Sequence, residues 1–233
     1  MPEFSVIIPA FNEEKTIVTA IAATSRVFEQ LGKSFEIIVV DDGSTDKTAN
    51  IVEDFVMARR AVPVHLIRHA KNQGKGAAVR TGALAAQGGW IVFLDSDLAA
   101  HPSEIAKAIP VLDDSDIIIG SRRVAGADIA ERQPVYRHWL GRLFNLFIRI
   151  YLGLPFRDTQ CGFKIFNKKM RPLFESLKST GWTFDVELLY RARHQGLRIR
   201  EIPVTWRHGR DSRVRLGHVW DILSELRRIK KQH

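Results

Sequence analysis

Short apolar stretches alternate with longer amphipathic stretches through the first half of the chain. The apolar stretches predict strands at residues 4–8, 35–40, 64–68, 90–94 and 117–119. The amphipathic stretches predict helices at about 14–31, from the mid-forties to about 60, at 74–87, and from Pro102 or Ser103 onward. Buried strands that alternate with helices indicate βαβ units on a mainly parallel sheet. The pattern therefore predicts an α/β fold.

Polar residues gather where four of the predicted strands end. These clusters are residues 9–13, Asp41-Asp42, residues 95–97 and Ser121-Arg122. Open α/β sheets bind ligands beyond the carboxyl ends of their strands. We therefore expect the clusters to line one cleft.

The pattern changes after about residue 124. A basic segment leads to an apolar helix at about 138–154, and the motifs RDTQCGFKIF and FDVELLY precede a pair of strands around IREIPVTWRH. No linker rich in Pro, Gly or Ser divides the chain. We expect one domain over residues 1–233, with a first half at 1–123 and a second half at 124–233.

The formal net charge is +9, which favours an anionic partner such as nucleic acid, an anionic membrane face or a phosphorylated substrate. The chain lacks RNP-type aromatic residues, zinc-finger spacing and a recognisable helix-turn-helix, so a nucleic-acid partner is not expected. The single cysteine, Cys161, excludes an internal disulfide and fits a reducing compartment. No signal peptide or apolar run of spanning length is apparent, so we expect a soluble or peripheral protein.

Asp95-Ser96-Asp97 places two carboxylates at the tip of the fourth predicted strand. A turn there lets both carboxylates reach one ion, and hard oxygen ligands suit Mg²⁺ or Mn²⁺. Such an ion would neutralise a diphosphate leaving group. The alternative is a solvated turn, because Asp and Ser are common in turns.

The second predicted strand ends in Asp41-Asp42-Gly43-Ser44, where a carboxylate is placed to bind a base or ribose. The alternative is that Ser44, Thr45 or Asp46 caps the following helix, and both roles can coexist. Lys75, between glycines at a helix start, resembles a phosphate cradle. The segment lacks P-loop spacing, so ATP hydrolysis is unsupported.

The apolar helix at about 138–154 carries a narrow polar stripe of His138, Arg142, Asn145 and Arg149. This pattern favours a helix lying in a membrane interface, with arginines that reach toward the headgroups. The alternative is a core helix, and in either case the helix is too charged to span a bilayer. The basic tail is read either as lipid-attracting or as a solvated helix face. Its basic residues are Arg227, Arg228, Lys230 and Lys231.

The chain resembles family 2 glycosyltransferases with the GT-A fold, and more closely the dolichyl-phosphate or polyprenyl-phosphate sugar synthases. The segments that carry the resemblance are, in order, IIPAFNEE, IVVDDGSTDKT, NQGKGAAVRTG, FLDSDL, GSR and RDTQCGFKIF. The resemblance implies a Rossmann-like, mainly parallel sheet flanked by helices, with an interfacial amphipathic helix. It makes residues 1–123 the nucleotide-sugar half and residues 124–233 the acceptor half. The implied activity is inverting transfer of a hexose to a lipid phosphate at the cytoplasmic face of a membrane.

The resemblance also assigns site residues. The nucleotide-sugar residues are Pro9, Phe11, Glu13, Asp42, Lys75, Asp95 and Ser96. The metal ligands are Asp95 and Asp97, and the basic residues for the phosphates are Arg122, Arg137, Arg207 and Arg213. Asp185 lies where other members place a catalytic acid or base. A lipid phosphate is already an oxyanion, so we expect Asp185 to orient the sugar or a basic side chain, or to complement the helix dipole.

Two positions depart from the mannosyl-type pattern. Arg213 replaces a lysine, and Ala99 replaces a glutamine that can help to hold the ion. The RDTQCGFK and FDVELLY segments look more like the glucosyl branch, which favours UDP-glucose. GDP-mannose, a soluble or polysaccharide acceptor, and the need for a separate membrane subunit stay open.

Overall fold

The computed structural model describes residues 1–59, 62–129, 135–207 and 219–231, with the backbone alone for 135–141 and 219–221. The strands are β1 (Phe4–Ala10), β2 (Phe35–Asp41), β3 (Val64–Arg68), β4 (Trp90–Leu94), β5 (Ile117–Ser121), β6 (Asp128–Ile129), β7 (Phe163–Asn167), β8 (Ile199–Pro203) and β9 (Thr205–Trp206). The α-helices are α1 (Ile17–Gln30), α2 (Thr48–Ala58), α3 (Lys75–Ala85), α4 (Ile105–Ala108), α5 (Val135–Leu152), α6 (Arg171–Ser176), α7 (Phe184–His194) and α8 (Val219–Lys231).

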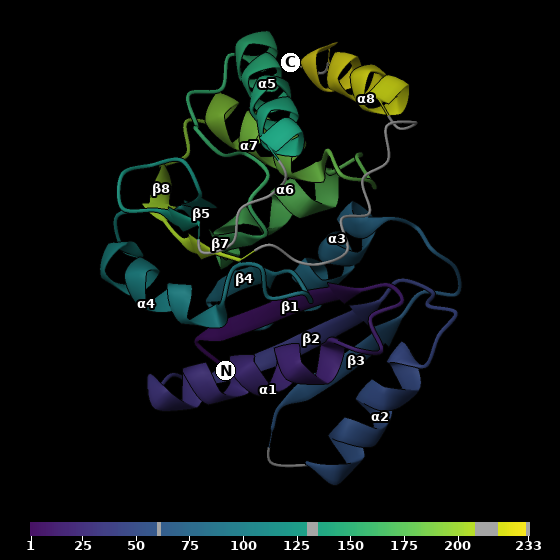
Figure 1. The fold of residues 1–233 in the computed structure, drawn as a ribbon. Coiled ribbons are helices and arrows are strands. Elements are labelled where there is room, and N and C mark those ends of the chain that lie inside the picture. The colour runs from purple at the N-terminus through teal and green to yellow at the C-terminus, as the bar shows by residue number, and fades with distance from the viewer. Residues whose placement is uncertain (60–61, 130–134, 208–218, 232–233) are drawn as a thin grey trace.

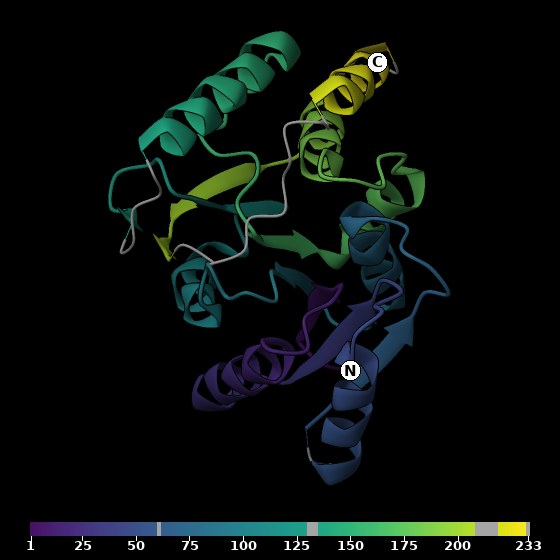
Figure 2. The same ribbon diagram turned by 45° about the vertical axis from the view of Figure 1, so that its right-hand side comes forward.

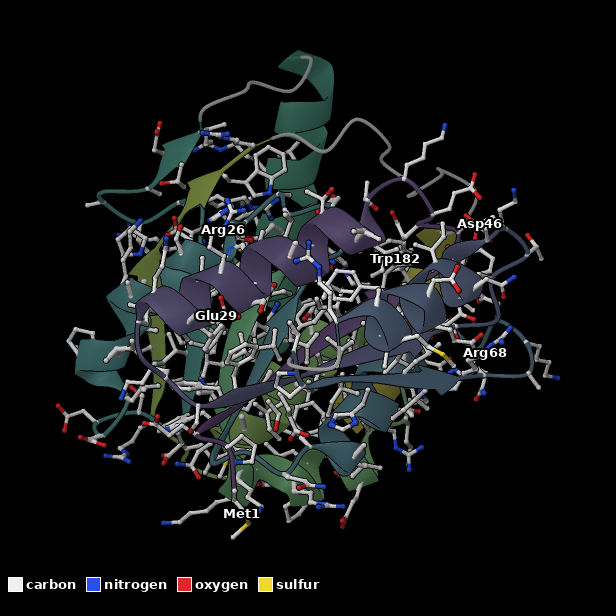
Figure 3. The ribbon with its side chains drawn as sticks, turned by 90° about the horizontal axis from the view of Figure 1, so that it is seen from below. Met1, Arg26, Glu29, Asp46, Arg68 and Trp182 are labelled. Atoms are coloured by element: carbon white, nitrogen blue, oxygen red, sulfur yellow. The ribbon has the colours of Figure 1, made fainter. Side chains whose placement is uncertain are left out.

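All five predicted strands are present, and the prediction of an α/β fold with a mainly parallel sheet is confirmed. Strands β1, β2 and β5 run past their predicted ends, because ladder pairing continues to Ala10 opposite Asp41 and to Ser121 opposite Pro203. The polar clusters therefore begin at the last paired residues of these strands. In Figure 3 the labelled Asp46 and Arg68, which follow or end β2 and β3, lie toward the same end of the molecule.

The main sheet has the strand order β3-β2-β1-β4-β7-β5-β8. Strand β7 comes from the RDTQCGFKIF segment and runs antiparallel between β4 and β5. The two strands expected around IREIPVTWRH exist, but they pair with other strands and not with each other. β8 pairs with β5, and β9 pairs with β6 in a second small sheet. Strands from both halves of the chain thus share one sheet.

Helices cover both faces of this sheet (Figure 1). Alternate side chains of each strand enter different cores, so that Ile7 packs with α3 and α7 whereas Val6 and Ile8 pack with α1 and α2. Helices α5, α6 and α8 join the core of the α3 face, and α4 joins the other. In both ribbon views α5 and α8 lie at the end of the molecule opposite α2 (Figures 1 and 2).

Helix α5 begins and ends slightly before its predicted bounds, and the members of its predicted polar stripe differ in exposure. Arg142 is exposed and Arg149 is half-buried, while the side chain of His138 lies outside the described residues. Asn145 is buried and donates to Thr159 Oγ1 at 3.2 Å. Ile148 and Leu152 on the neighbouring turns are also buried. The exposed face carries large apolar side chains beside Arg142, so the core alternative describes one face of the helix and the interfacial prediction stays open for the other. The residues of this exposed apolar face are Leu143, Leu146, Phe147 and Ile150.

Helix α8 is amphipathic and packs beside α5. Leu226 and Ile229 enter the core, while Lys230 Nζ donates to the Tyr151 carbonyl at 3.0 Å. Among the described helices, we find none with the length and apolar character to cross a bilayer.

Candidate functional site

The loops after β1 and β2 are tied together by Asn12. Its backbone adopts a φ of +53°, a left-handed conformation that asparagine tolerates. Its Oδ1 accepts the Thr45 N–H at 2.8 Å, and its own N–H donates to Ser44 Oγ at 2.9 Å. Asp46 Oδ1 accepts the N–H of Thr48, the first residue of α2, at 2.9 Å. The N-cap position of α2 is Lys47, so the capping role expected of Ser44, Thr45 or Asp46 is not realised, and Asp46 instead bonds two residues ahead within the loop. The two loops form one wall of the site.

A cavity of about 440 Å³ opens where β2 and β3 end. Two of its lining residues form an ion pair, with Asp41 Oδ2 3.9 Å from Arg68 Nε. The cavity thus offers both hydrogen-bond donors and acceptors, as a nucleobase with its ribose requires. The sequence analysis did not select Arg68 or His69, since only their position after β3 hints at a role. The lining residues are Asp41, Gly43, Ser44, Thr45, Arg68, His69 and Ala70.

Asp42 is buried and bonded to the protein itself. Its carboxylate accepts the N–H groups of Gln73 at 2.9 Å and Gly74 at 2.8 Å, and it lies 2.6 Å from His69 Nδ1. These bonds hold the loop from which α3 starts at Lys75. The observed role of Asp42 is therefore to position that loop, and its contact with a nucleotide stays a prediction.

The residues selected after β1 lie at the carboxyl end of that strand. Pro9 is buried opposite Val40, and Phe11 is half-buried just beyond the strand. Glu13 Oε2 accepts the Thr16 hydroxyl at 2.6 Å. None of these three residues lines the cavity beside Asp41 and Arg68, and their nucleotide contacts stay predictions.

The two candidate metal ligands lie beside a lysine. Lys75 Nζ is 2.6 Å from Asp95 Oδ1 and 5.1 Å from the ring centres of both Phe93 and Trp182. Burial lowers the pKa of Lys75, but the carboxylates of Asp95, Asp185 and Asp97 together outweigh this effect and leave the pKa raised. Asp97 Oδ1 accepts the Ala99 N–H at 2.9 Å, so the turn alternative is also realised. Reduced hydration and the charge of Asp95 raise the pKa of Asp97.

Gly162 packs directly against Asp95. The Asp95 N–H donates to the Gly162 carbonyl at 3.2 Å, and a Cβ at Gly162 would lie 2.0 Å from Asp95 Oδ2. Any larger residue would displace the carboxylate. Sequence reasoning did not select Gly162, although its place in the RDTQCGFK motif was a usable signal.

The oxygen ligands of Asp95 and Asp97 fit a divalent cation whose other ligands are phosphate and water. Within the described ranges, no group of three or more His, Cys, Asp or Glu side chains forms a protein-only metal site. The Gly162 backbone leaves the space that Asp95 needs, and Ala99 adds no ligand. The donor set therefore suits a metal shared with a bound diphosphate.

A buried ion pair lies behind these carboxylates. Lys164 Nζ on β7 is 2.7 Å from Asp185 Oδ1 and donates to the Cys161 carbonyl at 2.5 Å. Burial raises the pKa of Asp185, and the charge of Lys164 opposes that shift. Two of the roles expected for Asp185 fit its position: it contacts the basic side chain of Lys164, and it lies in the first turn of α7, where a carboxylate complements the helix dipole. Lys164 was not foreseen, because a lone lysine in an apolar strand reads as solvent-facing.

Arg122 makes a two-pronged ion pair with the buried Asp158. Its Nε and Nη2 lie 2.6 Å and 2.9 Å from the two carboxylate oxygens. Although burial alone would raise it, Arg122 lowers the pKa of Asp158 to about 2. The guanidinium also lies 5.4 Å from the Trp206 ring. Arg122 is thus held in place at the end of β5, and its contact with phosphate stays a prediction.

Of the other predicted basic residues, the structure describes only Arg207 with its backbone contacts. The Arg207 N–H donates to the Ala99 carbonyl at 2.8 Å, which brings the end of β9 beside the Asp95–Asp97 turn. Arg213 lies outside the described residues. Arg137 lies in α5, but its side chain is outside the description.

The chain is similar to known proteins over most of its length. Residues 5–172 match the model of "Glycosyl transferase family 2". The dolichyl-phosphate beta-glucosyltransferase ALG5C of Trichomonas vaginalis is 34% identical over 96% of this chain and 69% of its own length. The dolichyl-phosphate beta-glucosyltransferase of Saccharomyces cerevisiae is 32% identical over 91% of this chain and 69% of its length. The chain therefore spans about two thirds of these relatives.

A solved structure shares the fold. It is glucosyl-3-phosphoglycerate synthase from Mycobacterium tuberculosis in complex with Mn²⁺, UDP-glucose and phosphoglyceric acid. The TM-score is 0.70 at 22% identity, over 99% of this chain and 79% of that one. The likeness confirms the expected GT-A architecture.

Proposed function

Because the chain belongs to glycosyl transferase family 2, we propose that it transfers glucose from UDP-glucose to dolichyl or polyprenyl phosphate. The product is a β-linked lipid-phosphate glucose, formed with inversion at the anomeric carbon. The names of the relatives from Trichomonas vaginalis and Saccharomyces cerevisiae support both the sugar and the acceptor.

The observation that carries the acceptor class is the buried pair of Asp185 and Lys164. A base that activates a hydroxyl acceptor must reach the proton that it removes. Asp185 is only 4% exposed and its Oδ1 lies on Lys164, so it is poorly placed for that task. A phosphate acceptor already carries its negative charge and needs no such base.

The donor lies in the cleft at the carboxyl ends of β1, β2 and β4. The cavity beside Asp41 and Arg68 takes the uridine, and Lys75 meets the diphosphate. Asp95 and Asp97 would hold Mg²⁺ or Mn²⁺, and the ion would supply charge neutralisation to the departing diphosphate.

The acceptor phosphate attacks the anomeric carbon in line with the bond that breaks. Asp158 holds Arg122 in place, and the Ala99 carbonyl anchors the Arg207 backbone beside the Asp95–Asp97 turn. With Arg137 and Arg213, they hold the attacking phosphate near the leaving one. Positioning and charge stabilisation thus supply most of the rate enhancement.

The exposed apolar face of α5 fits a membrane-bound acceptor. Leu143 and Ile150 are 60% and 73% exposed, a costly arrangement in water that becomes favourable inside a headgroup layer. Basic residues at the end of α8 lie beside it and attract anionic lipid. We place the protein peripherally at the cytoplasmic face of a membrane, with residues 124–233 as the acceptor half.

The test is a panel of radiolabelled UDP- and GDP-sugars with polyprenyl phosphate, with and without Mn²⁺ or Mg²⁺. We expect metal-dependent glucose transfer from UDP-glucose. Asp97→Ala should lower it at least a hundredfold while leaving thermal unfolding unchanged, since Asp97 is open to solvent. The exposed Asp114→Ala is the matched control. Transfer from GDP-mannose alone, or only to a soluble acceptor, would overturn the assignment.

A further inference from the structure

Trp182 is a large apolar side chain left open beside the most charged part of the cleft. It is 38% exposed and lies in the loop 177–183, between α6 and α7. Trp182 does not line the cavity beside Asp41 and Arg68, and it is not part of the Asp95–Asp97 turn. An exposed indole at such a place is a candidate contact for a ligand with apolar faces.

The loop that bears Trp182 is held on both sides. On the N-terminal side of Trp182, the Ser179 N–H donates to the Glu187 carboxylate at 2.7 Å, and the Thr180 carbonyl accepts the Ala77 N–H at 3.2 Å. After it, the Thr183 hydroxyl donates to Glu225. The indole is therefore presented on a preorganised loop, which lowers the entropy lost when a ligand binds.

Two glycines bring this loop close to the start of α3. A Cβ at Gly74 would lie 2.4 Å from the Thr180 carbonyl oxygen, and one at Gly76 would lie 2.7 Å from the Phe184 Cβ. The close packing fixes the Trp182 loop relative to Lys75, the first residue of α3.

Lys75 contacts both the Trp182 indole and Asp95 of the Asp95–Asp97 turn. Its Nζ lies 5.1 Å from the Trp182 ring centre and 2.6 Å from Asp95 Oδ1. Because both distances start from Lys75 Nζ, their sum is an upper limit for the separation between the Trp182 ring centre and Asp95 Oδ1. Figure 3 shows Trp182 lying inward from Asp46 and Arg68 in that view. A diphosphate bound at Asp95 and Asp97 would bring its attached sugar within reach of the indole.

We propose that Trp182 is the platform on which the hexose of the nucleotide-sugar donor packs, and thus a specificity-determining residue. This inference rests on the proposed function. A pyranose ring whose hydroxyls are equatorial presents C–H groups on its faces, and these pack against the indole. The cation–π contact with Lys75 fixes the ring beside the diphosphate.

The experiment compares UDP with UDP-glucose by calorimetry in the presence of Mn²⁺. Trp182→Ala should weaken UDP-glucose binding about tenfold, the size expected for one aromatic contact. UDP binding should stay within about twofold, because UDP lacks the sugar. Trp182→Phe should keep most of the affinity, and Trp182→Leu, which keeps apolar volume without a π face, should lose it. Trp90→Phe is the matched control, since Trp90 begins β4 at the end away from Asp95.

Thermal unfolding shows which variants are folded, and the comparison of the Phe and Leu variants decides the question if the Ala variant unfolds. Equal losses of affinity for UDP and UDP-glucose in the Trp182 variants would overturn the platform. Unchanged affinity for both nucleotides together with a raised KM for lipid phosphate would also overturn it. A wild-type protein that binds no nucleotide-sugar would overturn the proposed function and the platform with it. Wild-type binding without any effect at Trp182 would overturn the platform alone.

Discussion

The ammonium group of Lys164 lies 2.7 Å from Oδ1 of Asp185, and both side chains are almost completely buried. The pair links β7, just after Gly162, to the first turn of α7. The charge of Asp185 also acts on Lys75, which in turn contacts Asp95. The interior charges and the candidate metal ligands thus form one connected group.

Removing the Lys164 ammonium should destabilise the fold. Lys164→Met leaves the Asp185 carboxylate buried without its partner, and we expect a loss of roughly 3–5 kcal/mol in the free energy of unfolding. Urea denaturation measures it. Lys169→Met, which changes an exposed lysine near the same strand, should cost less than about 0.5 kcal/mol. A Lys164→Met protein as stable as the wild type would contradict the buried pair.

The Arg122–Asp158 pair predicts a pH dependence of stability. The pKa of Asp158 is about 2 in the folded protein against an ordinary value of 3.8, so its stabilisation is present above 3.8 and is lost as pH falls toward 2. The stability gap between wild type and Asp158→Asn should therefore narrow by about 2 kcal/mol between pH 5 and pH 2. Denaturant titrations at several pH values measure this gap. The gap for the exposed Asp54→Asn should stay nearly constant, and a constant gap for Asp158 would refute the prediction.

Adding one methyl group at Gly162 should disable the site. Gly162→Ala would push the Asp95 carboxylate from its position, because the new Cβ would lie 2.0 Å from Oδ2. We expect glucose transfer to fall about a hundredfold, the order of loss that follows a small misplacement of a reacting group. Mn²⁺-dependent binding of UDP should weaken in parallel. Gly89→Ala, whose Cβ would meet only the Glu3 carbonyl at 3.6 Å, should be neutral.

Charges on the exposed face of α5 should weaken membrane binding. Phe147→Glu combined with Ile150→Glu removes two exposed apolar side chains and adds repulsion from anionic lipid. We expect at least a tenfold loss of sedimentation with vesicles of anionic phospholipid, and unchanged UDP affinity. The control is Met57→Glu, since Met57 is 76% exposed and belongs to α2, the helix at the opposite end of the molecule from α5 (Figure 1). Equal vesicle binding by both variants would remove α5 from the membrane surface.

Local patterns were sufficient for the first half of the fold. The apolar runs that became β1, β2, β4 and β5 are buried on both faces, so their composition alone identified them. The edge strand β3 is only partly buried, yet its short apolar run was also sufficient. The polar clusters that follow them come to one edge, as parallel strands require. Boundaries were less accurate, because ladder pairing with a neighbour carried β1 on to Ala10.

The second half depended on contacts that local patterns do not encode. The antiparallel insertion of β7 depends on pairing with both β4 and β5, which are distant in sequence. The inward turn of Asn145 on α5 was missed for a similar reason, because it depends on Thr159, which accepts its hydrogen bond.

The sequence by itself determined the order of strands and helices in the first half, the two carboxylates at the end of β4 and the resemblance to a transferase family. Only the tertiary structure decided which charges are paired and which remain open to a ligand. Asp42, Arg122 and Asp185 all carry suitable chemistry, yet each is engaged by a partner within the protein. The physical reason is desolvation, since a buried charge needs a partner that only long-range packing can bring to it.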